Sequence, residues 1–330
     1  MNFGVGIIGC GLIGRKRAMS LGSGKLVACA DIKEENARSL AQKSGARVFG
    51  GWRKLLAMPE VEIVFIATLH DSLAEITLAA IEAGKHVLVE KPAARNFAEL
   101  EPVMAAAQRS GVKVHVGFNH RYHRALRKAK EIVESGALGE LMFIRARYGH
   151  GARVGYDKEW RANPVLSGGG ELIDQGPHLI DLSRWFLGEF SEVQGFAHTY
   201  YWDMPVDDNG FMMLKTSKQQ VAFLQASCTE WKNLFSMEIY GRYGKLDISG
   251  LGGSYGVERI THYKMLPEMG PPETTAWEYP MADDSWAVEI NEFYDDIRLN
   301  RTPSAGLKDA FEALKVVEKI YKESGYDHCA

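Results

Sequence analysis

The chain has 330 residues, of which 46% are hydrophobic and 25% are charged, and this globular composition predicts about two domains. A net charge of −3 and a pI of about 6.4 argue against a surface for nucleic acid or an acidic membrane. We expect no secretory signal and no membrane span, because no apolar run approaches roughly 18 residues. The scattered cysteines predict a cytoplasmic protein without structural metal or disulfides; they are Cys10, Cys29, Cys228 and Cys329.

The first 120 residues alternate short apolar runs with amphipathic segments. Strands are predicted at 3–9, 26–31, 61–68, 86–90 and 112–118, and helices at 33–45, 72–84 and 96–111. Ser72 with Glu75, and Asn96 with Glu99, have the spacing of a capping box at a helix start. Apolar strands that are each followed by a helix predict a doubly wound parallel sheet, with ligands beyond the carboxyl ends of its strands.

The first strand runs into the glycine loop "GCGLIG", which has the G-x-G-x-x-G spacing and opens a helix. Asp31 ends the next strand, 20 residues after the central glycine (31 − 11 = 20). Such a loop brings backbone N–H groups close to a pyrophosphate, so the pattern predicts dinucleotide binding. The predicted cofactor contacts are Gly9, Gly11, Leu12, Ile13, Gly14, Asp31, Ile32, Thr68, His70, Glu90 and Lys91.

Asp31 also bears on which dinucleotide binds. Its carboxylate would accept a hydrogen bond from the ribose 2′-OH of NAD and would repel the 2′-phosphate of NADP. Lys33, two residues later, softens that repulsion. The sequence therefore favours NAD over NADP.

The pattern changes after residue 120. A helix at 121–136 is followed by strands at 141–149, 193–202, 210–216, 220–229, 235–240, 245–249 and 256–265, and two helices at 286–300 and 308–324 end the chain. Short turns between most strands predict a mostly antiparallel, open sheet. We therefore expect a Rossmann domain at 1–120 and an α+β domain at 121–330, with the last helices free to pack back on the Rossmann domain.

A three-glycine run leads into "ELIDQGPHLIDL", which carries Asp174 and His178. On a continuous helix residues four apart share a face. Pro177 removes a helix hydrogen bond, so it predicts either a kink or a restart of the helix. The pair could be functional, or Asp174 could be a helix cap and His178 a packed histidine.

Four stretches of the chain are typical of one known family: "GCGLIG", "AGKHVLVEKP", "WRANPVLSGGGELIDQGPHLIDL" and a C-terminal "NEFYDDIRLNRTPSAGLKDAFEALKVVEKIYKES". Through them the chain resembles the glucose–fructose oxidoreductase, inositol dehydrogenase and MocA family over essentially its whole length. The resemblance implies a Rossmann domain that binds NAD(P) and a second domain that binds substrate. It also implies a homodimer or homotetramer formed through the C-terminal sheet; from charge and composition we expect no nucleic-acid or membrane partner.

The same resemblance assigns roles to residues. Lys91, in Glu90-Lys91-Pro92, is implied to be the active-site lysine, with Asp174 and His178 completing the catalytic group and a cis peptide before Pro92. The chain departs from the family's T-P-N-x-x-H pattern, because it has "TLHDSL" at 68–73. That departure changes the contacts expected on the nicotinamide side.

The implied reaction is hydride transfer between a hydroxyl-bearing carbon and C4 of nicotinamide. His178 suits the proton transfer, and the Lys91 ammonium would stabilise the developing alkoxide. The reverse assignment, in which Lys91 moves the proton, stays open. Asp174 would orient His178 or a substrate hydroxyl.

Aromatic faces and forked donors suit sugars, and several lie close in sequence to the implied site. We expect substrate contacts from Asn119, Arg121, Tyr122, Tyr148, Trp160, Arg161, Asp174 and His178. Trp160 by itself could equally be a packing aromatic.

Three functions compete. The first is an NAD(P)-dependent dehydrogenase that acts on the CH–OH group of a sugar, polyol or nucleotide sugar. The second is a glycoside-cleaving enzyme that uses NAD only transiently, and the third is a non-catalytic regulator that senses the cofactor. Lys91, Asp174 and His178 are all present, which favours the two enzymes over the regulator.

Overall fold

The computed structural model describes residues 3–326, which fall into two compact units. The first unit contains the chain up to Phe118 together with Trp286–Leu314. The second contains Asn119–Ser285 together with the chain from Lys315 onward. Cys329 lies outside the described residues.

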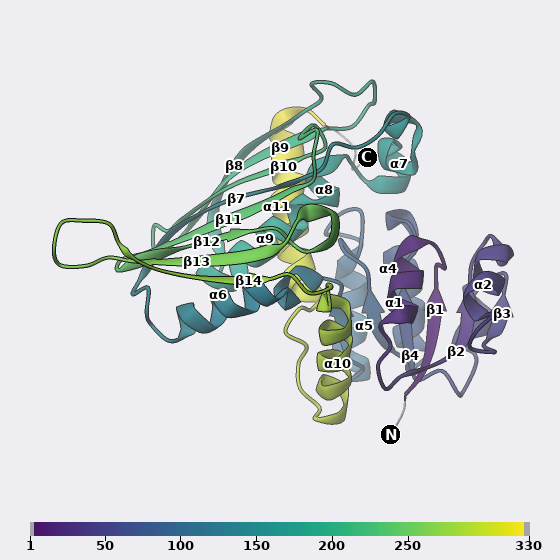
Figure 1. The fold of residues 1–330 in the computed structure, drawn as a ribbon. Coiled ribbons are helices and arrows are strands. Elements are labelled where there is room, and N and C mark those ends of the chain that lie inside the picture. The colour runs from purple at the N-terminus through teal and green to yellow at the C-terminus, as the bar shows by residue number, and fades with distance from the viewer. Residues whose placement is uncertain (1–2, 327–330) are drawn as a thin grey trace. The chain divides into compact units, whose positions relative to one another are not determined.

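The first unit contains a six-stranded parallel sheet in the order β3-β2-β1-β4-β5-β6 (Figure 1). Its strands are β1 (Gly4–Ile8), β2 (Lys25–Ala30), β3 (Arg47–Phe49), β4 (Ile63–Ile66), β5 (His86–Val89) and β6 (Val114–Val116). The order reverses between β1 and β4, as in a Rossmann fold. The predicted doubly wound sheet is confirmed, and the strand that was missed, β3, is three residues long and only half-buried.

Six helices surround this sheet: α1 (Leu12–Met19), α2 (Glu34–Ala41), α3 (Trp52–Leu56), α4 (His70–Glu82), α5 (Leu100–Ser110) and α10 (Ser285–Arg298). The two central strands, β1 and β4, are buried along their whole length. Ile290, Phe293 and Tyr294 of α10 belong to the same apolar cluster as Phe3 and Val5. Helix α10 therefore completes the core of the first unit, although it is nearly 170 residues away in sequence from its last strand.

The capping box predicted at Ser72 is wrong. Helix α4 begins two residues earlier, at His70, because Leu69 takes the extended backbone of an N-cap residue. Ser72 lies inside the first turn, where its hydroxyl donates to Thr68 Oγ1 at 3.0 Å, and Glu75 pairs with Arg53.

At the next helix the cap has a different form. Asn96 Oδ1 accepts the Glu99 N–H at 3.0 Å, as a capping box requires. The Glu99 carboxylate accepts the Arg95 N–H instead of that of Asn96, and α5 begins at Leu100.

The second unit contains an eight-stranded sheet in the order β14-β13-β12-β11-β7-β10-β9-β8 (Figure 1). Its strands are β7 (Leu141–Gly149), β8 (Phe190–His198), β9 (Asn209–Thr216), β10 (Val221–Ser227), β11 (Leu234–Gly241), β12 (Gly244–Ser249), β13 (Glu258–Lys264) and β14 (Glu273–Tyr279). All neighbours are antiparallel except β7 and β10, which confirms the predicted mostly antiparallel sheet. β14 was not predicted because this exposed edge strand has no alternation of apolar and polar residues.

One face of this sheet carries helices. α6 (Arg124–Glu134) packs against β12–β14, and α8 (Glu171–Asp174) and α9 (Gly176–Leu187) contact β7, β9 and β10. The remaining elements are α7 (Pro164–Ser167), α11 (Leu307–Ser324) and the 3-10 turns η1 (Asn119–Tyr122), η2 (Tyr156–Lys158), η3 (Trp160–Ala162) and η4 (Gly253–Tyr255). Within residues 3–326, no helix has the length and apolar character needed to cross a bilayer.

Candidate functional site

The glycine loop lies between β1 and α1. Gly9 has φ +87°, and a Cβ there would lie 2.4 Å from the Ala67 carbonyl oxygen. A Cβ on Gly14 would lie 2.0 Å from the Gly9 carbonyl oxygen, while one on Gly11 would meet nothing within 4 Å. Gly9 and Gly14 therefore allow tight packing, and Gly11 leaves the backbone at the start of α1 open to an approaching phosphate.

Asp31, directly after β2, braces that loop. Its Oδ2 accepts the Cys10 N–H at 2.7 Å, and its Oδ1 accepts the Lys33 N–H at 2.8 Å. An ionised carboxylate has about four acceptor sites, so two remain for the hydroxyls of a ribose. The residue can hold the loop in shape and contact a nucleoside at the same time.

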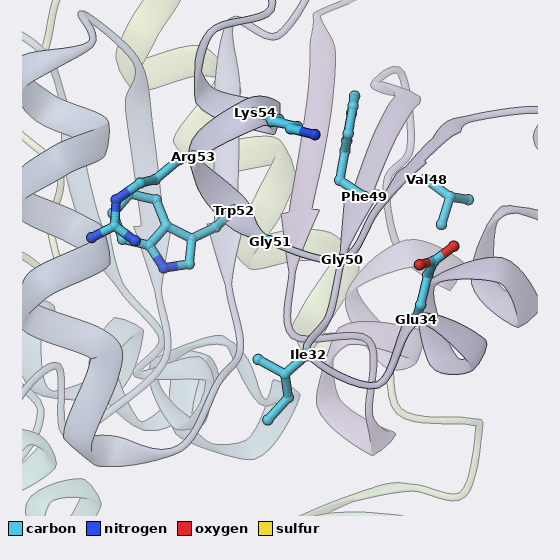
Figure 2. A pocket seen from close by; sticks show the side chains of 9 residues that line it. All are labelled: Ile32, Glu34, Val48, Phe49, Gly50, Gly51, Trp52, Arg53 and Lys54. Carbon is cyan, nitrogen blue, oxygen red and sulfur yellow. The ribbon is translucent and has the colours of Figure 1, made fainter.

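A hollow of about 650 Å³ lies next to Asp31 in the first unit (Figure 2). Ile32, which is 92% exposed, is one of its lining residues. Trp52 and Arg53 also line it, and the Arg53 guanidinium stacks 4.0 Å from the centre of the Trp52 ring. Glu34 and Lys54 also line it, so both charge signs are present. The remaining lining residues are Val48, Phe49, Gly50 and Gly51. The volume is within the range of small-ligand sites.

Thr68 and His70 lie where β4 gives way to α4. Thr68 is half-buried, and His70 is buried as the first residue of α4. Leu12, at the start of α1, is 73% exposed, and Ile13 beside it is half-buried. These four of the predicted cofactor contacts therefore lie just after the carboxyl ends of β1 and β4, next to the point where the strand order reverses.

Lys91 stands directly after β5 and Glu90. The peptide bond to Pro92 is cis, as the family resemblance implies. The Glu90 N–H donates to the Ile66 carbonyl at 2.9 Å, and the Ala93 N–H returns to the Glu90 carbonyl at 3.0 Å. Lys91 is half-buried in a tight turn that is hydrogen-bonded to the end of the sheet, so its ammonium starts from a well-defined backbone position.

Asp174 and His178 belong to the second unit, on two successive helices. α8 ends at Asp174, and α9 begins at Gly176 with Pro177 in its first turn, where the missing N–H costs nothing. Of the two outcomes predicted for Pro177, the structure shows the restart. The pair is therefore arranged by a helix junction and not by a continuous helix face.

Contacts within the second unit hold both side chains. Arg161 Nε donates to Asp174 Oδ2 at 2.8 Å. The His178 ring stacks on the His120 ring with centroids 3.7 Å apart and planes 22° apart. Tyr148 meets His120 edge-on at 4.8 Å. Arg161, Tyr148, Asp174 and His178, all predicted substrate contacts, thus lie in one group of neighbouring side chains.

Sequence reasoning missed a buried carboxylate in this group, Glu171. The Tyr156 hydroxyl lies 3.4 Å from Glu171 Oε2, and His150 Nε2 lies 3.5 Å from Glu171 Oε1. Burial raises the pKa of Tyr148 well above its usual value, and the nearby Asp174 and Glu171 charges raise it further. Tyr148 therefore stays a neutral hydrogen-bonding hydroxyl. Glu171 stands three residues before Asp174, a spacing that places both on one side of a helical turn.

Asn119, Arg121 and Trp160 have partners within the second unit. Arg121 makes a buried two-point ion pair with Asp181 of α9, with Nε 2.8 Å from Oδ2. Asn119 Nδ2 donates to Ser285 Oγ at 3.2 Å, and the Trp160 ring lies under the Arg161 guanidinium at 4.6 Å. The Arg121 fork holds η1 on α9, so its role in substrate binding stays a prediction.

Asp207 anchors the start of α8. Its Oδ2 accepts the Leu172 N–H at 2.7 Å, and its Oδ1 accepts the Gly170 N–H at 3.0 Å and the Tyr321 hydroxyl at 2.6 Å. A Cβ on Gly170 would lie 1.9 Å from the Asp207 carbonyl oxygen, so the close approach needs glycine. One buried carboxylate thus sets the start of the short helix that ends in Asp174.

The ionisation of Asp207 makes the stability depend on pH. Burial raises the pKa of Asp207 to about 6, although Tyr321, Leu172 and Gly170 all donate to it. A carboxyl whose folded pKa is raised stabilises the fold at low pH and loses that contribution as pH rises toward the folded pKa. From pH 5 to 7.5 the free energy of unfolding of the native protein should fall by about 1 kcal/mol relative to Asp207→Asn. Urea titrations of both proteins across this range measure the difference, and a constant difference would contradict the assignment.

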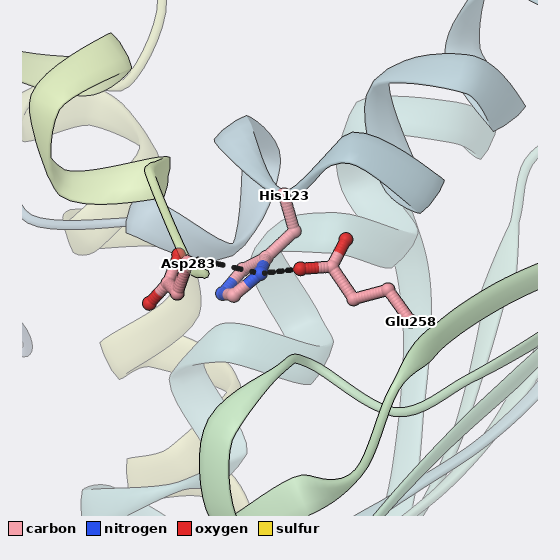
Figure 3. A group of neighbouring side chains, drawn as sticks. All are labelled: His123, Glu258 and Asp283. Carbon is pink, nitrogen blue, oxygen red and sulfur yellow. Dashed lines mark hydrogen bonds and ion pairs between the residues drawn. The ribbon is translucent and has the colours of Figure 1, made fainter. Parts of the chain in front are cut away.

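A separate cluster of ionisable side chains in this unit consists of His123, Glu258 and Asp283 (Figure 3). His123 Nδ1 lies 2.7 Å from Glu258 Oε1 and 3.9 Å from Asp283 Oδ1. Glu258 Oε2 also accepts the Ala125 N–H in the first turn of α6, and Asp283 Oδ1 accepts the Ser285 N–H at the start of α10. These contacts cap two helix starts, and we assign the group that structural role.

Two family models match the chain, one in each of its two units. Residues 3–118 match the model of an oxidoreductase family with an NAD-binding Rossmann fold, and residues 126–247 match the GFO/IDH/MocA C-terminal domain. An uncharacterized oxidoreductase of Bacillus subtilis, YrbE, is 31% identical over 334 residues, which cover 94% of this chain and 91% of that protein.

A levoglucosan dehydrogenase of Pseudarthrobacter phenanthrenivorans is 32% identical over 231 residues, or 65% of this chain. The chain spans only 59% of the length of that relative. A solved structure of levoglucosan dehydrogenase with NADH and levoglucosan superposes with a TM-score of 0.87, with 98% of each chain covered and 24% identity. At that identity the structural likeness establishes the fold.

Proposed function

We propose that this chain, which belongs to the GFO/IDH/MocA family of oxidoreductases, transfers a hydride between a hydroxyl-bearing carbon of a sugar or polyol and C4 of the nicotinamide of NAD. The observation that carries the proposal lies within the first unit. The glycine loop braced by Asp31 and the Lys91 turn stand at the carboxyl ends of one parallel sheet, where such folds bind dinucleotides. The named activity of the levoglucosan dehydrogenase relative supports a carbohydrate as substrate.

The side chains divide the chemistry as follows. The bound nicotinamide supplies the hydride acceptor. His178 takes the hydroxyl proton, since an imidazole suits proton transfer near neutral pH, and Asp174 orients the substrate hydroxyl together with Arg161. The Lys91 ammonium stabilises the negative charge that develops on the substrate oxygen. Lys91 as proton-transfer group is the alternative assignment.

We further propose NAD as the physiological cofactor, with NADP weaker. Asp31 presents a carboxylate where a 2′-phosphate would come, and Glu34 adds a second carboxylate to the hollow beside it. In this proposal residues 1–120 bind the dinucleotide, with its adenosine half at the hollow. Residues 121–330 bind the substrate and form the oligomer. We also propose that the protein is cytoplasmic, because its free cysteines at 10, 29 and 228 suit a reducing compartment.

The direct test of the function is NAD⁺ reduction against a panel of polyols, aldoses, anhydrosugars, amino sugars and nucleotide sugars. The proposal expects NADH to accumulate stoichiometrically with at least one of them. A glycoside-cleaving enzyme would instead release an aglycone with no net NADH. A cofactor-sensing regulator would bind NAD without turning over any compound.

We also propose a homodimer or homotetramer formed by the sheet face opposite the helices of the second unit. Phe196 is 72% exposed, and Met213 and Phe223, directly opposite each other on β9 and β10, are each 50% exposed. Apolar side chains gathered on a flat face favour association with another copy.

The exposed face makes a specific prediction. The native protein should sediment as a dimer or tetramer, and Phe223→Glu should shift it to a smaller species because a charge on the apolar face opposes burial. Met269→Glu, on a fully exposed loop methionine, is the control and should leave the sedimentation coefficient unchanged. A native monomer at micromolar concentration would contradict the assignment.

A further inference from the structure

Four charged or titratable side chains meet inside the first unit, and we call them the buried charge cluster: Arg17, Glu90, His115 and Glu289. Arg17 of α1 donates from Nε to Glu90 Oε1 at 2.7 Å and from Nη1 to Glu289 Oε2 on α10. The other Glu289 oxygen, Oε1, lies 3.3 Å from His115 Nε2 on β6. Segments up to 272 residues apart thus converge on one guanidinium.

The cluster is costly to bury. The Arg17 and Glu289 side chains are fully buried, and only 11% of the Glu90 side chain is exposed. Desolvating each ion costs several kcal/mol, and a well-packed apolar set of the same volume is often at least as stable. Stability alone therefore gives little reason for three buried charges at this position. A better reason is that their hydrogen bonds hold the side chains in a fixed geometry.

Within the cluster the two carboxylates are not equivalent. Burial raises the pKa of Glu90, and the neighbouring Glu289 charge raises it further, while Arg17 opposes both. The pKa of Glu289 is lowered in spite of its burial, because Arg17 and His115 favour its charged form. Arg17 therefore favours the charged form of Glu90 against the effect of burial, and the adjacent Lys91 acts in the same direction.

Packing leaves the guanidinium little room. The Trp286 ring covers it at 4.4 Å. On Gly117 an added Cβ would lie 2.8 Å from Arg17 Nη2 and 2.9 Å from Glu90 Oε2. Both ends of the Arg17–Glu90 pair are thus held by fixed neighbours.

We propose that Arg17 is a positioning residue that fixes Glu90 and thereby aims the Lys91 ammonium. Glu90 immediately precedes Lys91, and its carbonyl closes the turn with the Ala93 N–H. Arg17 lies three residues after Gly14 on α1, so the same guanidinium links the helix of the dinucleotide loop to the lysine turn. The proposal rests on the function proposed above only in taking Lys91 as the reactive amine.

The test combines kinetics with hydrogen exchange. Arg17→Lys keeps the charge but loses the planar fork that reaches Glu90 and Glu289 from two nitrogens. We expect kcat to fall about 10- to 100-fold while KM for NAD stays within about threefold. Amide exchange in residues 88–95 should accelerate about tenfold or more. Arg109→Lys, at an exposed position of α5 in the same unit, is the matched control and should leave kcat, KM and exchange unchanged.

Gly117→Ala provides a second variant that crowds the same pair without changing any charge. It keeps the proposal testable if Arg17→Lys does not fold, and the same pattern of lower kcat, unchanged KM and faster exchange is expected. Unchanged exchange at 88–95 together with native kcat in either folded variant would overturn the proposal. If no sugar or polyol is oxidised at all, the function proposed above fails, and the exchange measurement alone decides on Arg17.

Discussion

Replacing Lys91 with methionine should lower kcat by about 10²- to 10³-fold while leaving the affinity for NAD within about threefold of native. Methionine has a similar length and no charge, so the variant removes the ammonium that would face the developing alkoxide. The turn itself should persist, because its hydrogen bonds run from the backbones of Glu90 and Ala93. Steady-state NADH formation gives kcat, and quenching of intrinsic fluorescence on titration gives the NAD affinity.

Lys43→Met is the matched control, since Lys43 is exposed after the end of α2 in the same unit. It should keep native kcat and native NAD affinity. A Lys91→Met enzyme with near-native kcat would remove Lys91 from the chemistry. Loss of NAD binding together with activity would instead give Lys91 a role in holding the cofactor.

The second large effect is expected from His178→Gln, which should lower kcat by about 10²- to 10⁴-fold. Glutamine keeps a polar side chain beside His120 but cannot take up the hydroxyl proton. The limb of the kcat/KM profile near neutral pH should therefore vanish along with the rate. Initial rates from pH 5 to 9 measure both quantities.

This variant also decides between the two proton-transfer assignments. If Lys91 moves the proton, the pH limb persists in His178→Gln and disappears in Lys91→Met. His198→Gln, an exposed histidine on β8, controls for the general effect of the substitution and should leave the profile unchanged.

Much of the fold could be predicted because its signals are local. Buried parallel strands are apolar throughout, so β1, β4 and β5 were predicted close to their observed bounds. The exceptions are also local in origin. At Ser72 a favourable cap spacing was present, but the backbone of Leu69 starts the helix earlier. At Pro177 the sequence allowed two outcomes, and the structure has a new helix that begins at Gly176 with the proline in its first turn.

In the candidate site, too, some features could be predicted from the sequence and others could not. The glycine loop, Asp31 and Lys91 stand next to strand ends, so their positions followed from the sheet. The ion pairs between distant segments could not be predicted in this way, because Arg17 meets Glu90 across 73 residues and Arg121 meets Asp181 across 60. No periodicity encodes such pairs. Glu90 was predicted as a cofactor contact, and nothing in the sequence identified Arg17 as its partner.

The central claim is a direct hydride transfer from a substrate carbon to nicotinamide, and isotope tracing tests it most directly. The best substrate from the NAD⁺ panel is prepared with deuterium at its oxidised carbon, and the NADH formed is analysed by mass spectrometry. We predict one deuterium in each NADH, at C4 of the nicotinamide, together with a slower turnover than with the unlabelled substrate. NADH without deuterium, or product formed with no net NADH, would contradict the account.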